Sequence, residues 1–116
     1  MKSYTDLEQS KKLAEILPIE SADYHYIDVV GYPERLRFYP YATSNRSNED
    51  LLFIPCWSLA ALLGVLEHPR CFQGDKPIYW FCGCFGKDNL YHEVEADNPI
   101  DACVTMIEKL NELKML

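Results

Sequence analysis

Residues 80–96, WFCGCFGKDNLYHEVEA, hold the pattern that decides the fold: two strand-forming runs joined by a turn. The second run alternates between two faces, with Leu90, His92, Val94 and Ala96 on one and Tyr91, Glu93 and Glu95 on the other. A period of two is typical of a strand with one buried face. Together with the preceding run, Ile78–Phe85, it predicts an antiparallel hairpin with the face of Val94 in the core.

The length of the turn decides which side chains of the first run share that core face. A loop of even length places Tyr79, Phe81 and Phe85 there and turns both cysteines to the opposite side from His92. A three-residue loop, Lys87-Asp88-Asn89, with Asn89 in a left-handed bulge position, instead places Trp80, Cys82 and Cys84 there. The sequence leaves both registers open.

The second register raises the question of a metal site, because Cys84 is then a direct neighbour of His92 and Cys82 lies diagonal to it. Zinc accepts such ligands, but a fourth is missing nearby. A Cys–His dyad for catalysis also needs an orienting group and an accessible cleft. Because free cysteine packs in cores like a small apolar residue, we expect no metal, cofactor or catalytic residue here. The alternative hypothesis is a small metal-binding or thiol-dependent protein that uses Cys82, Cys84 and His92.

Apolar periodicity and helix-stop signals place the remaining elements. They are a helix over Thr5–Leu17 with a Thr5/Glu8 capping box, a first hairpin over Tyr24–Val30 and Arg35–Tyr39, an apolar helix from Cys56 or Ser58 to Leu66, and a last helix from Asp97 to about Lys114. This helix-hairpin-helix-hairpin-helix order predicts one α+β domain over residues 1–116. We expect an antiparallel sheet of about four strands with helices packed against it.

Composition narrows the class of partner. The chain has 116 residues, with 18 acidic against 11 basic side chains and a net charge of −7. An acidic chain is a poor binder of a phosphate backbone and of anionic lipid. The N-terminus has no secretory pattern, and the sequence has no stretch long and apolar enough for a membrane span. Five cysteines, an odd number, indicate reduced thiols and a cytoplasmic location.

Two surfaces are candidates for binding a partner. The first hairpin carries an aromatic and basic set, Tyr24, Tyr26, Arg35, Arg37 and Tyr39. Such a set resembles a stacking platform for single-stranded nucleic acid, but the net charge favours a protein partner or ordinary half-buried strands. The apolar middle helix offers Leu59, Leu62, Val65 and Leu66 as a homodimer interface. The N-terminal helix is the competing cover for that surface, and the sequence leaves the choice open.

Three stretches resemble a family of small uncharacterised proteins from prophage-like regions of gut anaerobic bacteria and from their phages. They are SKKLAEILPIESAD at 10–23, PCWSLAALLGVLE at 55–67 and EADNPIDACVTMIEKLNELKML at 95–116. The resemblance implies a cytoplasmic, phage-encoded accessory protein and carries no functional residues. With no catalytic constellation in the sequence, we expect a non-enzymatic protein-interaction module.

Overall fold

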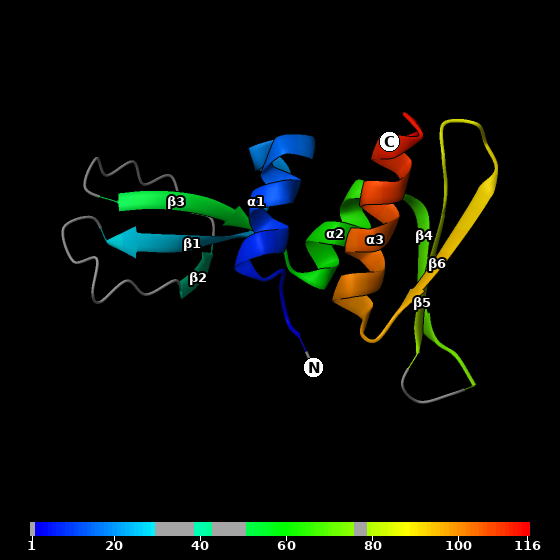
Figure 1. Ribbon diagram of the computed structural model, residues 1–116, viewed down its shortest axis with the longest axis horizontal. Helices are drawn as coiled ribbons and strands as arrows, with labels where there is room; N and C mark the ends of the chain where they lie inside the picture. The colour runs from blue at the N-terminus through cyan, green and yellow to red at the C-terminus, as the bar shows by residue number, and fades with distance from the viewer. Residues whose placement is uncertain (1, 30–38, 43–50, 76–78) are drawn as a thin grey trace.

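Two antiparallel sheets lie at opposite ends of the molecule, with the helices between them (Figure 1). The computed structural model describes residues 2–29, 39–42, 51–75 and 79–116. In chain order the elements are α1 (Leu7–Ile16), the 3-10 turn η1 (Ile19–Ser21), β1 (Tyr24–Val29), β2 (Tyr39–Ala42), β3 (Leu51–Cys56), α2 (Leu59–Val65), β4 (Glu67–Gln73), β5 (Trp80–Phe85), β6 (Tyr91–Ala96) and α3 (Pro99–Glu112). The predicted α+β class is confirmed.

The expected sheet of about four strands is corrected to two sheets of three strands among the described residues. Their orders are β2-β1-β3 and β4-β5-β6. Two strands were not predicted from the sequence: β3, which pairs with β1 from Tyr24↔Cys56 to Val29↔Leu51, and β4, which pairs with β5. β3 contains Pro55 and β4 contains Pro69, and a proline in a sequence usually argues against a strand. Both are edge strands, where one row of backbone groups is unpaired and proline is tolerated.

The start of α1 also differs from the prediction. The capping box is formed by Asp6 and Gln9 rather than by Thr5 and Glu8. The Gln9 amide donates to Asp6 Oδ1 at 2.8 Å, and the Asp6 amide donates to Gln9 Oε1 at 3.0 Å. Thr5 is fully buried, with its Oγ1 accepting from the Trp57 amide at 3.1 Å. Thr5 therefore fastens the N-terminal segment to the end of β3 and is unavailable as a cap.

Helix α3 is the centre of the core. Asn98 caps the helix, since its side chain accepts from the Asp101 amide at 2.9 Å, and Pro99 opens it. α3 contacts β5 and β6 on one side and α1 and α2 on the other. Its buried residues are Pro99, Ile100, Ala102, Cys103, Val104, Met106, Ile107 and Leu110. None of the described helices is long and apolar enough to cross a membrane.

Of the two arrangements left open for the short helix α2, a homodimer interface or cover within the monomer, the structure favours the second, because Leu62 and Leu66 lie in the core of one chain. Leu62 has no exposed surface and Leu66 only 7%. Leu59 and Val65 are half-buried and pack against the same cluster. A surface that includes Leu62 and Leu66 is therefore already covered within one chain.

Candidate functional site

The second hairpin adopts the register with the three-residue loop. Cys84 lies opposite His92, and Cys82 lies opposite Val94. The Gly86 amide donates to the Leu90 carbonyl at 3.2 Å, and Asn89 has the predicted left-handed backbone with a φ of 61°. Both cysteines therefore share the inner face of the second sheet, which packs against α3.

The three residues of the hypothetical metal site have other partners. His92 Nε2 lies 3.2 Å from both carboxylate oxygens of Asp88. The thiol of Cys82 is hydrogen-bonded to that of Cys103 on α3, and Cys84 is fully buried. Within residues 2–29, 39–42, 51–75 and 79–116, no group of three or more His, Cys, Asp or Glu side chains is arranged to hold a metal ion.

The buried thiols are also poorly placed for nucleophilic chemistry, which requires an accessible thiolate. Burial raises the pKa of Cys84 to about 11 and raises that of Cys71 as well. The hydrogen bond between Cys82 and Cys103 lowers the pKa of Cys82 and raises that of Cys103. Cys82 is thus the thiol that ionises more easily, yet it has no exposed surface. These cysteines act as core residues.

The tyrosines of the first hairpin are only partly at the surface. Tyr26 is buried, and its hydroxyl donates to the Thr5 carbonyl at 2.7 Å. Tyr24 is half-buried beside Tyr4, with the ring centres 6.1 Å apart. Arg35 and Arg37 lie outside the described residues, as does the side chain of Tyr39. The structure therefore gives Tyr26 a packing role.

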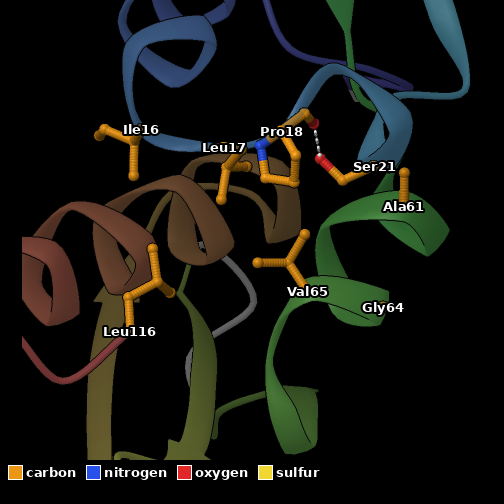
Figure 2. A pocket seen from close by; sticks show the side chains of 8 residues that line it. All are labelled: Ile16, Leu17, Pro18, Ser21, Ala61, Gly64, Val65 and Leu116. Atoms are coloured by element: carbon orange, nitrogen blue, oxygen red, sulfur yellow. Dashed lines mark hydrogen bonds between the residues drawn. The ribbon is translucent and has the colours of Figure 1, made fainter.

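An apolar groove of about 560 Å³ lies between the end of α1 and the outer side of α2 (Figure 2). Its lining residues are Ile16, Leu17, Pro18, Ser21, Ala61, Gly64, Val65 and Leu116. Ser21 is the one polar side chain in that lining, and its Oγ donates to the Pro18 carbonyl and accepts from the Trp57 indole. Small-molecule sites orient their ligands with a few available polar groups, and this lining has no side chain to supply one.

The outer face of the second sheet is the stronger candidate. Figure 1 shows α3 on one side of β4, β5 and β6 and no helix on the other. Alternation turns three rows of residues to that open side: Glu67, Phe85 and Tyr91; Arg70, Gly83 and Glu93; and Phe72, Phe81 and Glu95. We call these nine residues the outer face.

Aromatic rings dominate the outer face. Phe72 and Phe81 are stacked, with ring centres 5.3 Å apart and planes 16° apart. Phe85 meets Tyr91 edge to face at 5.7 Å. Phe72, Phe85 and Tyr91 remain 37%, 40% and 42% exposed. Large exposed apolar side chains that gather on one surface mark an interaction site in a folded protein.

Charged side chains lie on both margins of the outer face, Glu67 and Arg70 on β4 and Glu93 and Glu95 on β6. On β4, the Arg70 guanidinium lies 5.8 Å from the Phe72 ring centre and makes no ion pair with any described residue. On β6, Glu93 accepts a hydrogen bond from the Tyr91 hydroxyl at 3.0 Å, and Glu95 is exposed. Burial and that hydrogen bond raise the pKa of Tyr91.

Between the margins, Gly83 permits the close approach of the Tyr91 ring. A Cβ at Gly83 would lie 1.9 Å from the Tyr91 hydroxyl oxygen and 2.4 Å from Cζ. Tyr91 therefore lies across the middle of β5. Arg70 and Phe72 were not predicted as site residues because β4 was not predicted, although residues 70–73, RCFQ, carry the alternation of a short strand.

The chain was compared with protein-family models, with curated proteins and with solved structures, and none of the three comparisons finds a match. The outer face is accordingly defined by its own geometry: exposed rings, charged margins and a glycine beneath the central ring.

Proposed function

We propose that this protein is a non-enzymatic protein-interaction module that binds through the outer face. The observation that carries the proposal is the contrast between the two sides of one sheet. The inner side is closed by α3, while the outer side keeps Phe72, Phe85 and Tyr91 about two-fifths exposed. Aromatic residues and arginine are the side chains that contribute most to protein interfaces.

The charge of the outer face supports a protein partner over nucleic acid. Arg70 is accompanied there by Glu67, Glu93 and Glu95, and the chain carries a net charge of −7. A phosphate backbone requires clustered lysine and arginine, which the outer face lacks. The resemblance to phage accessory proteins extends the proposal: the partner is a phage or host protein of the cytoplasm. The five cysteines, all without disulfides, fit that location.

Differential capture tests the proposal. The native chain and the variant Phe72→Glu/Phe85→Glu are used as baits in lysates of infected and uninfected host cells. We expect a protein retained by the native chain to be lost from the variant. The matched control is Ile19→Glu/Leu113→Glu, because these residues are 55% and 49% exposed and lie off the outer face. Equal retention by all three baits would contradict the proposal.

A further inference from the structure

We propose that the outer face is self-complementary and that its occupant is a second copy of this chain. The inference rests on the proposed function, because it names the partner of the same face. The central row of the outer face runs across the sheet from Arg70 on β4 through Gly83 on β5 to Glu93 on β6. Opposite charges therefore lie at equal distances on either side of β5.

A two-fold axis parallel to β5, between two stacked sheets, exchanges the left and right margins. β4 of one copy then lies over β6 of its partner at the same height along the strands. Arg70 of each copy faces Glu93 of the other, with Glu95 the next outward residue along that strand. The two contacts are identical, as a closed two-fold interface requires. A two-fold axis perpendicular to the strands and through the central row would instead stack β4 antiparallel on β4 and place Arg70 over Arg70 and Glu93 over Glu93.

The remaining residues fit this arrangement. Phe81 and Phe85 lie on β5, close to the axis, and each meets its own counterpart. In each copy the Tyr91 ring lies across Gly83. Stacked sheets are about 10 Å apart, and this spacing suits two facing layers of aromatic side chains. Glu67 comes to lie over Tyr91 of the other copy rather than over a carboxylate. Arg70, which lacks an ion pair among the described residues, gains one.

The interface is small. Three strands of about six residues cover a patch of roughly 15 by 20 Å, well under the size of a standard stable interface. The association is therefore a weak one, favoured at high protein concentration. Each copy also carries a net charge of −7, so general repulsion acts against it.

Charge reversal tests the inference by sedimentation equilibrium from low micromolar to millimolar concentration. We expect the native chain to approach twice its mass of 13.5 kDa. Arg70→Glu and Glu93→Arg alone should remain monomeric, because each puts like charges in register. An equimolar mixture of these two variants should form a heterodimer, and the double variant R70E/E93R should dimerise again. Lys11→Glu and Glu112→Arg, both exposed and away from the sheet, control for the change in net charge.

The mixture keeps the test independent of folding, since two misfolded variants do not rescue each other. A native chain that stays monomeric, single variants that dimerise like the native chain, or a mixture that stays monomeric would each overturn the inference. The first outcome leaves the proposed function standing if the Phe72→Glu/Phe85→Glu bait still loses a captured protein. Equal retention by all baits removes the proposed function itself, so the two failures are told apart.

Discussion

The inner and outer faces of the second sheet are built from the same three strands and have opposite surroundings. Every second residue of β5 points to α3, and Cys82 and Cys84 there are fully buried. The residues between them point outward, where Phe85 is 40% exposed. A strand with one face in the core and one in water normally carries polar side chains on the second face. Here the second face carries three phenylalanines and a tyrosine beside its four charged side chains.

The comparison shows that the outer face is exposed to solvent but differs in composition from an ordinary polar surface. On the inner face, the small thiol side chains of Cys82 and Cys84 pack against α3 in one core cluster. The outer face has larger side chains and nothing in the described chain to cover them. Stability and binding are therefore separated on the two sides of one sheet, and substitutions on each side have different consequences.

The largest effect is expected on the inner side. Ile107 of α3 is fully buried in the cluster that contacts the sheet. Ile107→Ala should lower the free energy of unfolding by about 2–5 kcal/mol, because it removes buried methyl groups and leaves a cavity. Urea titration measures the change. Ile19→Ala is the matched control, since Ile19 is 55% exposed, and its effect should stay within about 0.5 kcal/mol. Equal midpoints for the two variants would contradict the assignment of the α3 core face.

The second prediction concerns pH and the buried thiols. Burial raises the pKa of Cys84 from 9.0 to about 11. Between these values the unfolded chain releases the proton and the folded chain retains it, so the stability that this thiol contributes is complete below pH 9 and falls as pH rises to 11. The loss from Cys84 should be at most about 3 kcal/mol, since two pKa units correspond to about 1.4 kcal/mol each.

Urea titrations at several pH values measure this slope in the native chain and in Cys84→Ala. The variant should lose less stability across the same interval, whatever its stability at pH 7. Identical slopes would mean that Cys84 is in contact with water, and the inner face would then be less completely closed than its burial indicates.

The third prediction concerns the coupling of Gly83 to Tyr91. A methyl group at Gly83 displaces the Tyr91 ring, which now occupies that space. In a Tyr91→Ala background the methyl group meets no ring, and replacing glycine within a strand then becomes favourable. The double-mutant cycle should give a coupling of about 1 kcal/mol between the two positions. Additive effects on the denaturant midpoint would show that the ring does not lie across β5.

Local patterns in the sequence were sufficient for part of this fold. The second hairpin follows from alternation and α3 from its cap and apolar stripe, since both depend on neighbours within a few residues. The capping box was predicted one residue too early, because Thr5 and Asp6 are both good caps. Tertiary hydrogen bonds of the Thr5 side chain, among them the one from the Trp57 amide, separate them.

How deeply each helix is buried depends on where it lies relative to the sheet and the other helices. The sequence alone does not give that position. The apolar α2 was expected to be covered either within the chain or by a second copy, yet Ala60 and Gly64 are exposed because α2 lies beside the core. A smaller fraction of α3 is apolar, but α3 lies between the sheet and two helices. The outer face was missed for a related reason: β4 supplies Arg70 and Phe72, and Pro69 conceals that strand.

The smallest effect is expected on the outer side, where Phe85→Ala should cost only about 0.5 kcal/mol of folding free energy. Phe85 meets the His68 ring at 6.2 Å and the Tyr91 ring at 5.7 Å, and all three lie at the surface. Their contacts are therefore largely made in water, and removing the Phe85 ring leaves no closed cavity. Urea titration of Phe85→Ala beside Ile107→Ala measures the contrast between the faces directly. A loss of several kcal/mol would place Phe85 in the core and withdraw it from binding. A small loss leaves the ring available to a partner, because the fold does not require it.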